Sequence, residues 1–519
     1  MRRARPTRVL PGDRGDGGRV VVWLLVAVLL VGAGGVGAWY AGALDRFLCE
    51  GGTCAPTDVA APSSLDLPAS RAAGTVLEPA QGPALDPAKV EGAVAGLLDA
   101  ESLGPHVGVA VRDLSSEQDV YAYAEGGPSL VPASTLKLLT SAAALASVGP
   151  QTRFATTVRQ VAAPSAAPTS PATGATPDAA PAPVTPARLV LVGGGDPLLL
   201  TRPQTGDDAA YPVARATLRD LARRTAAGLR DQGVTQATVA FDDSLFTGPG
   251  DSPRWEPQYV AGDLATTVSA LWTDEGLLGD DGVRSREPAL DATRAFVRLL
   301  GQQGITVTDE PARQAAPAGA TELARVESPT VDQIVQHTLE SSDNEAAEVL
   351  LRQVAVAEGQ PASFDGGAAA VEQVLTGLGV PWDGNTVVDG SGLSRDNRVT
   401  ATSMLTLLGL ASAAPAATED PDLEALRGIV AGLPVAGFNG SLGGRFTSSG
   451  TDAGLGVVRA KTGTLTGVHA LAGVGVDASG TPFAFVGLAD RVPVPLTLDA
   501  RAQLDRVAAA LAACACSAG

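Results

Sequence analysis

The chain has 519 residues and a formal net charge of −19, with 45% hydrophobic and 18% charged residues. This length allows two or three domains with a large core, and the composition is typical of a globular protein. The acidic balance argues against a nucleic-acid partner, because nucleic-acid-binding surfaces are basic.

The first clear signal along the chain is the uncharged, apolar run Val20–Leu44, which is long enough to span a bilayer. Six arginines lie within residues 1–19, so the positive-inside rule predicts a cytoplasmic N-terminus and an extracytoplasmic remainder. The run exceeds a usual signal-peptide core, and no clear A-x-A site follows it. We therefore expect a single-pass signal anchor in the cell membrane over residues 20–44; secretion after signal cleavage is the alternative.

The four cysteines form two pairs, Cys49 and Cys54 just after the anchor and Cys514 and Cys516 in the last six residues. They favour disulfides in an oxidising exterior. Neither pair has a neighbouring histidine, which argues against a zinc site built on cysteine. The spacing leaves open whether each pair closes locally or the disulfides tie the two ends together.

Residues 45–86 follow the anchor, and their Ala-, Pro-, Ser- and Asp-rich composition predicts a disordered tether. Folding is expected from Pro87, with a helix over residues 88–98. Two strands of a hairpin are predicted over residues 106–114 and 119–125.

A strong helix signal covers Ser134–Val148, after Pro132 and before Gly149 and Pro150. The low-complexity residues 163–187 then interrupt two strand-like segments, and we expect them to form a disordered loop. Further helices are predicted over residues 218–233 and 289–304, and a helix–break–helix over residues 330–356.

Ser134 and Lys137 are the first candidates for chemistry. Only three of the 37 lysine and arginine residues are lysines. A desolvated lysine can lose its proton and act as a base, which a guanidinium cannot, and a serine needs a base before it attacks a carbonyl. Residues three apart share a helix face. The alternative is a helix-capping serine beside a solvated lysine, because S-x-x-K alone is frequent by chance.

Two further motifs follow in chain order: Ser342-Asp343-Asn344 and Lys461-Thr462-Gly463-Thr464. S-x-x-K, S-D-N and K-T-G together are the signature of penicillin-binding proteins and class A β-lactamases. A Ser-His-Asp triad has little support, because the chain has three histidines and no G-x-S-x-G elbow.

The chain resembles one branch of this superfamily, the penicillin-binding D-alanyl-D-alanine carboxypeptidase/endopeptidase family (class C low-molecular-mass penicillin-binding proteins). Between Lys137 and Ser342 lie 204 residues, similar to a large insertion in that family and far more than in β-lactamases. The resemblance covers roughly Pro87–Ala512. The blocks that carry it beyond the three motifs are Gly193–Leu199, Phe241–Trp255, Asp389–Thr400 and Leu433–Phe446.

The resemblance implies the α/β (α+β) penicillin-recognising, β-lactamase-like fold, in which helices flank an antiparallel sheet. A large, mostly β domain is expected to be inserted after the nucleophile helix. The expected boundaries are residues 87–152 and 324–519 for a discontinuous serine DD-peptidase domain, and residues 153–323 for the inserted domain.

The resemblance also implies the catalytic roles. Ser134 is the acylated nucleophile and Lys137 its general base, with the helix N-terminus favouring the alkoxide. Ser342 relays a proton to the leaving amine, and Asn344 holds the substrate amide. Lys461 supplies positive charge from a sheet-edge strand, near Ser342 and the substrate carboxylate.

The substrate-binding strand is implied to comprise Thr462, Gly463 and Thr464. Thr462 binds the carboxylate, and the backbone N–H groups of Ser134 and Thr464 form the oxyanion hole. Arg395 is a candidate for substrate recognition; a structural salt bridge is the alternative.

The function implied is a serine-type D-Ala-D-Ala carboxypeptidase that acts on peptidoglycan stem peptides and is inhibited by β-lactams. Endopeptidase action on cross-links is left open, and no metal or cofactor is implied. Two alternatives remain, a β-lactamase of the same fold and a non-catalytic cell-wall-binding relative. The insertion argues against the first, and the intact motifs argue against the second.

Overall fold

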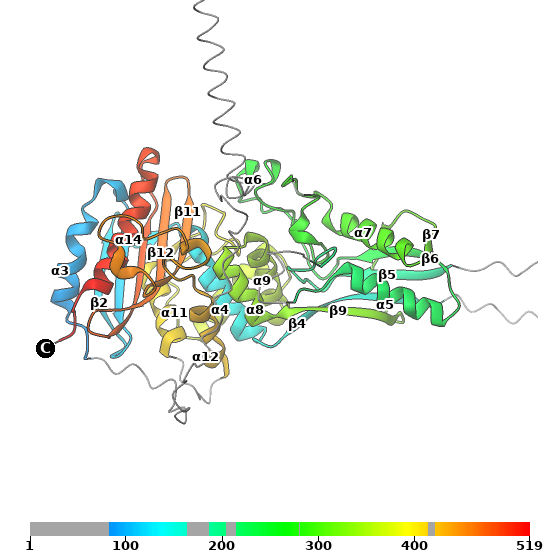
Figure 1. The fold of residues 1–519 in the computed structure, drawn as a ribbon, viewed down its shortest axis with the longest axis horizontal. Helices are drawn as coiled ribbons and strands as arrows, with labels where there is room; N and C mark the ends of the chain where they lie inside the picture. Colours follow the sequence, from blue (N-terminus) through cyan, green and yellow to red (C-terminus); the bar gives the residue numbers. More distant parts are fainter. Residues whose placement is uncertain (1–82, 163–185, 204–213, 280, 414–420, 519) are drawn as a thin grey trace, which may run out of the picture. The chain divides into compact units, whose positions relative to one another are not determined.

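The computed structural model divides the chain into two units, residues 1–76 and 77–519 (Figure 1). It describes residues 83–162, 186–203, 214–279, 281–413 and 421–518. Four sequence predictions therefore lie wholly or mostly outside the described residues: the segment 1–19, the anchor 20–44, the tether 45–86 and the loop 163–187. Within the described ranges, no helix has the length and apolar character needed to cross a membrane.

A five-stranded antiparallel sheet forms the centre of the peptidase domain, in the order β11-β12-β13-β1-β2. Its strands are β1 (Val107–Asp113), β2 (Gln118–Glu125), β11 (Arg459–Leu465), β12 (Val468–Val476) and β13 (Pro482–Ala489). β1 and β2 form the predicted hairpin. The short apolar run of β1 is buried along nearly its whole length, because helices cover both faces of the sheet. β11, which carries Lys461, lies at the edge.

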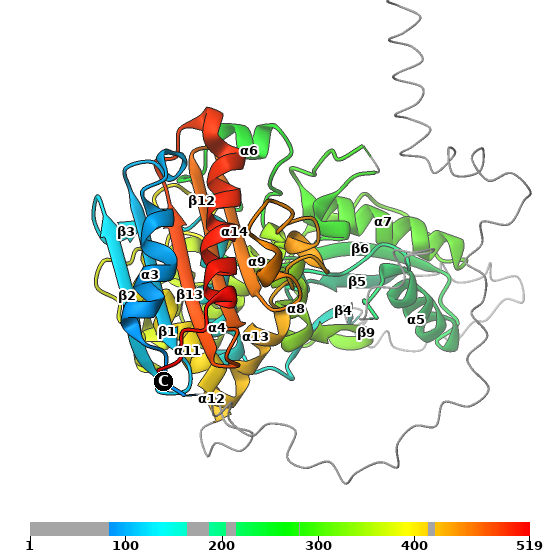
Figure 2. The same ribbon diagram turned by 60° about the vertical axis from the view of Figure 1, so that its left-hand side comes forward.

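One face of this sheet is covered by α3 (Pro87–Leu98) and α14 (Thr497–Ala513), which Figure 2 shows in front of the strands. α3 begins where its sequence predicts, because the Asp86 side chain accepts a hydrogen bond from the backbone N–H of Ala88 at the helix start. A disulfide joins Cys514 to Cys516, so this pair closes locally. Cys49 and Cys54 lie outside the described residues.

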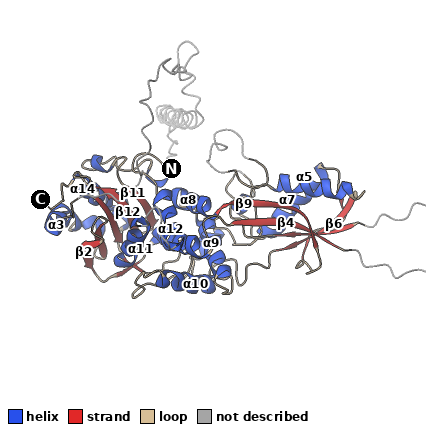
Figure 3. Cartoon of the chain, turned by 90° about the horizontal axis from the view of Figure 1, so that it is seen from below, coloured by secondary structure: helices blue, strands red, loops and turns tan. Residues whose placement is uncertain are grey.

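The opposite face packs against a group of helices that form the largest apolar cluster. These are α4 (Lys137–Ser147), α8 (Val331–Ser341), α9 (Asn344–Ala357), α10 (Phe364–Gly377), α11 (Ala401–Ala413), α12 (Pro421–Ala425) and α13 (Arg427–Gly432). Seen from below, α8, α9 and α10 lie between the five-stranded sheet and the six-stranded sheet that contains β4 (Arg153–Val161) and β9 (Thr321–Thr330) (Figure 3). α8 and α9 confirm the predicted helix–break–helix.

The inserted domain is built on a second sheet, in the order β7-β6-β5-β4-β9, with β8 paired to β6. Its strands are β4 (Arg153–Val161), β5 (Ala187–Val192), β6 (Gln236–Asp242), β7 (Thr306–Val307), β8 (Ala312–Arg313) and β9 (Thr321–Thr330). The sheet is mixed: β4 pairs antiparallel with β5 and β9, whereas β5 and β6 are parallel.

Two helices share an apolar core with this sheet: α5 (Leu218–Asp231) and α7 (Pro288–Gln302). Both helices follow the amphipathic patterns expected from the sequence. The expectation of a mostly β insertion was therefore wrong, because two long helices pack against its sheet and the domain is mixed α/β. β9 runs across the boundary expected between residues 323 and 324, because the strand pairs with β4 as far as Thr330. Thr330 then caps α8, so the chain passes directly from the insertion into the peptidase domain.

Candidate active site

Ser134 lies in a short 3₁₀ turn, Ala133–Leu136, that leads directly into α4. The helix expected from Ser134 therefore begins with a tighter turn. Ala133 has a left-handed backbone, with φ of 47°, which is costly for a residue other than glycine. Gly392 (φ of 85°) packs so closely on the carbonyl of Ala133 that a Cβ there would overlap it. The surrounding loop thus fixes the position of the serine.

Lys137 is the first residue of α4, and its side chain is fully buried. Its Nζ donates hydrogen bonds to Ser134 Oγ (3.1 Å), Asn344 Oδ1 (2.8 Å) and the backbone O of Ser391 (2.8 Å). The structure therefore brings two of the predicted motifs together at one ammonium or amine group. This geometry lets Lys137 exchange a proton with the serine hydroxyl.

The S-D-N motif forms the break between α8 and α9. Ser342 has a left-handed backbone, with φ of 63°, and it ends α8. Asp343 caps α9, because its carboxylate accepts the N–H of Ala346 at 2.9 Å. The turn directs Ser342 toward β11 and Asn344 toward Lys137. Asp343 therefore begins the second helix of the helix–break–helix predicted over residues 330–356.

β11 brings the third motif against the other two. Lys461 is fully buried, and its Nζ donates to Ser342 Oγ at 2.8 Å and to its neighbour's backbone O at 3.0 Å. Gly463 lets the strand approach the turn that holds Ser134, since a Cβ at this position would lie 2.6 Å from the backbone O of Pro132. Thr464 follows on the same strand and pairs with His469 of β12.

Burial lowers the pKa of both lysines. The pKa of Lys137 falls to about 8, because desolvation outweighs the opposing attraction of the carboxylates around it. The pKa of Lys461 falls well below its ordinary value, because desolvation and the charges of Lys137 and Arg445 act in the same direction. A fraction of neutral Lys137 is therefore present near neutral pH.

Glu348 is a buried residue beside Lys137 that the sequence analysis did not single out. Its carboxylate is buried and accepts the backbone N–H groups of Gly390 and Ser391, each at 2.9 Å. Ser391 in turn offers its carbonyl to Lys137. Burial raises the pKa of Glu348 to about 7, with Asp389 adding to the effect. The spacing S-D-N-x-x-x-E, one helical turn after Asn344, could have indicated it.

Two other residues organise the site from loops. Asp389 is fully buried and accepts hydrogen bonds from Trp255 Nε1 (2.9 Å) and from the backbone N–H groups of Gly392 (2.9 Å) and Ser394 (2.7 Å). Ser441 accepts the hydroxyl proton of Thr462 at 2.9 Å and so orients that side chain. Both residues belong to blocks that carried the family resemblance, but their roles depend on loop conformation.

Arg395 lies apart from the hydrogen bonds that Lys137 and Lys461 make. Its Nε pairs with Glu256 at 2.6 Å, and its Nη2 donates to the backbone O of Thr466 at 2.8 Å. These contacts tie together the insertion, the loop of Arg395 and the end of β11. They match the alternative of a structural salt bridge, and recognition of substrate by Arg395 stays a prediction.

Comparison with known proteins identifies relatives of this chain. The sequence profile of the D-Ala-D-Ala carboxypeptidase 3 (S13) family matches residues 90–280 and 278–511. A carboxypeptidase of Mycobacterium tuberculosis is 37% identical over 412 residues, 78% of this chain and 80% of the relative. The carboxypeptidase DacB of Mycolicibacterium smegmatis is 35% identical over 393 residues, 75% of this chain and 76% of the relative.

The fold also has a counterpart among solved structures. A crystal structure of penicillin-binding protein 4 from Haemophilus influenzae superposes with a TM-score of 0.60 and 20% sequence identity. The match covers 82% of this chain and 99% of the other. At this identity the likeness shows a common fold, including the penicillin-recognising arrangement expected from the sequence.

Proposed function

The chain belongs to the D-Ala-D-Ala carboxypeptidase 3 (S13) family and is a serine-type D-Ala-D-Ala carboxypeptidase; from this premise we propose that Ser134 is its nucleophile and Lys137 its general base. The observation that carries this proposal is the 3.1 Å contact between Lys137 Nζ and Ser134 Oγ in a buried site. Lys137 takes the hydroxyl proton as the serine oxygen attacks the peptide carbonyl.

We assign substrate binding mainly to the part of the site that β11 forms. A D-Ala-D-Ala terminus places a peptide carbonyl one residue from a free carboxylate. Lys461 and Thr462 bind this carboxylate, while the backbone N–H groups of Ser134 and Thr464 stabilise the oxyanion that forms on the carbonyl. Asn344 binds the substrate amide, and Lys137 holds its side chain in place.

The leaving amine departs with a proton supplied through Ser342. This hydroxyl lies 2.8 Å from Lys461 Nζ, which can replace the proton that Ser342 gives up. Departure of D-alanine leaves an acyl-enzyme on Ser134, and water then hydrolyses the ester. A β-lactam offers a similar carbonyl and carboxylate, but its leaving amine stays tethered, so we expect that acyl-enzyme to persist.

We propose peptidoglycan stem peptides outside the cytoplasm as the substrate, reached by a domain anchored through residues 20–44. The six N-terminal arginines support this orientation. Protease added to intact protoplasts should then remove the catalytic domain. Full protection of the domain, with a cytoplasmic control also protected, would contradict the proposed orientation.

The activity is tested on the purified full-length protein in detergent, with a peptide that ends in D-Ala-D-Ala. Free D-alanine should appear, and Ser134→Ala should abolish its release. A matched peptide whose terminal carboxylate is an amide should lose most turnover, because Lys461 and Thr462 then face a neutral group. A cross-linked peptide in the same assay reports on endopeptidase action.

Two outcomes would favour the alternative functions. Rapid hydrolysis of penicillin with an untouched peptide would favour a β-lactamase. A folded protein that neither releases D-alanine nor becomes acylated would favour a non-catalytic wall-binding role.

A further inference from the structure

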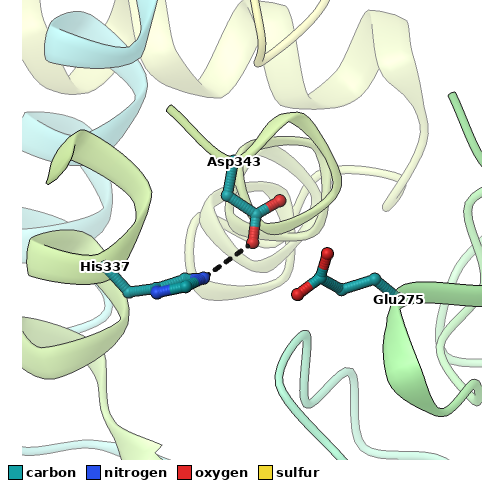
Figure 4. A group of neighbouring side chains, drawn as sticks. All are labelled: Glu275, His337 and Asp343. Carbon is teal, nitrogen blue, oxygen red and sulfur yellow. Dashed lines mark hydrogen bonds and ion pairs between the residues drawn. The ribbon is translucent and has the colours of Figure 1, made fainter. Parts of the chain in front are cut away.

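Three side chains with potential metal-ligand atoms converge between the inserted domain and the S-D-N turn (Figure 4). Glu275 comes from the insertion, His337 from α8 and Asp343 from the N-cap of α9. One potential ligand atom from each lies within 4.8 Å of the other two. His337 Nε2 lies 3.1 Å from Asp343 Oδ2, and the Glu275 carboxylate faces the Asp343 carboxylate.

The surroundings make this group different from a solvated acidic surface. The side chains of His337 and Asp343 are buried, and Glu275 is partly exposed. The nearby carboxylate of Glu345 already pairs with Arg284 at 3.1 Å. Two carboxylates that face each other where water is largely excluded repel, and a bound cation relieves that repulsion.

The backbone that presents Glu275 is held in a costly conformation. Asp274 and Glu275 are both left-handed, with φ of 54° and 55°, which is costly for residues other than glycine. The backbone O of Glu275 accepts hydrogen bonds from Thr266 Oγ1 (2.7 Å) and from Arg284 Nη1 (2.9 Å). Such strain persists only where neighbouring contacts enforce it, and it concentrates at functional sites.

We propose that Glu275, His337 and Asp343 form a binding site for a divalent transition metal, with zinc as the preferred ion. One imidazole nitrogen and two carboxylate oxygens suit Zn²⁺, whereas Mg²⁺ and Ca²⁺ take oxygen ligands. Zinc bonds of about 2.0–2.2 Å separate tetrahedral ligands by roughly 3.4 Å. Rotation of the Glu275 side chain can close the remaining distance, and water can fill the fourth position.

The site couples the insertion to the catalytic motif. Asp343 can bind the ion through Oδ2 and still cap α9, because its Oδ1 accepts the N–H of Ala346. It lies between Ser342 and Asn344, so an ion held there fixes the turn that positions both residues.

The test measures zinc binding directly, on full-length protein in detergent after chelator treatment and alkylation of free cysteines. Competition with a chromophoric chelator should give one zinc ion per chain, and millimolar Mg²⁺ should not displace it. Glu275→Gln should weaken binding at least about tenfold. The matched control Glu287→Gln, also in the insertion but with an exposed carboxylate, should bind zinc like the parent.

Zinc should also raise the thermal unfolding temperature of the parent and of Glu287→Gln, and raise that of Glu275→Gln by less at the same zinc concentration. Absence of zinc binding after alkylation, or equal affinity in Glu275→Gln and the parent, would overturn the proposal. A His337→Gln variant removes a buried side chain and can fail to fold. The partly exposed Glu275 therefore provides the variant on which the test of zinc binding depends. Because the readout is metal binding, the result is independent of the proposed catalytic roles.

Discussion

Lys137 and Lys461 are both fully buried, yet the charges around them have opposite signs. Burial lowers the pKa of each, but carboxylates counteract this effect at Lys137, whereas Lys137 itself and Arg445 reinforce it at Lys461. The carboxylates around Lys137 are those of Glu348, Asp343, Asp389 and Glu345. Lys137 is therefore suited to exchange a proton near neutral pH.

The environment of Lys461 is suited to a different task. A buried amine beside other cations gains a favourable partner when an anion binds. The substrate carboxylate would favour the protonated form of Lys461, so we expect binding at this end of the site to be coupled to proton uptake. The roles that we propose for the two lysines, a base at Lys137 and an anion-binding group at Lys461, fit this difference in environment.

The largest expected effect is a difference in acylation rate when each of the two lysines is replaced by arginine. Lys137→Arg keeps the charge and removes the neutral base, so acylation by a fluorescent penicillin should fall at least about 10²-fold. Lys461→Arg keeps a cation for the carboxylate and should lose less. Equal losses in stopped-flow acylation would contradict the division of roles, provided that circular dichroism shows both variants folded.

The next effect concerns the carboxylates around Lys137. Acylation should rise with pH through about 8, as Lys137 loses its proton. Glu348→Gln removes the foremost of the charges that raise the pKa of Lys137, so the midpoint should move to lower pH. The maximal rate should also fall, roughly tenfold, because the Ser391 carbonyl is held less firmly.

Glu358→Gln is the matched control, since this residue lies at the exposed end of the same helix α9. Its acylation rate and pH midpoint should equal those of the parent. If Glu348→Gln lowers the acylation rate but leaves its pH midpoint unchanged, the role of Glu348 is structural and does not include tuning the pKa of Lys137.

The smallest effect is expected at the anion-binding end. Ser441→Ala removes the acceptor that orients the hydroxyl of Thr462. Loss of one such hydrogen bond, about 1 kcal/mol, should weaken substrate binding about fivefold and appear in KM for D-alanine release. An effect on kcat alone, with KM unchanged, would contradict the assignment of Thr462 to carboxylate binding.

Much of this arrangement follows from local sequence signals. The amphipathic patterns predict α5 and α7, and the helix signal after Pro132 places Ser134 and Lys137 at a helix start. These features depend on periodicity and on short spacings, which the sequence displays directly. The edge strand that carries Lys461 was implied by the family resemblance.

Other features depend on contacts between distant segments. Glu348 acts through loop amides that lie more than 40 residues away along the chain, and Glu275 reaches the S-D-N turn from the insertion. The boundary expected between residues 323 and 324 falls inside β9. The sequence did not indicate this, because β9 is defined by its pairing with β4 and continues directly into α8. Such pairings leave no local pattern.

The most direct test of the account is intact-mass spectrometry of the full-length protein after treatment with benzylpenicillin, followed by peptide mapping. The account predicts one penicilloyl group per chain, located on Ser134, with no adduct in Ser134→Ala and slow labelling in Lys137→Arg. A stable adduct on another residue, or undiminished labelling of Ser134→Ala, would contradict the assignment of Ser134 as the nucleophile.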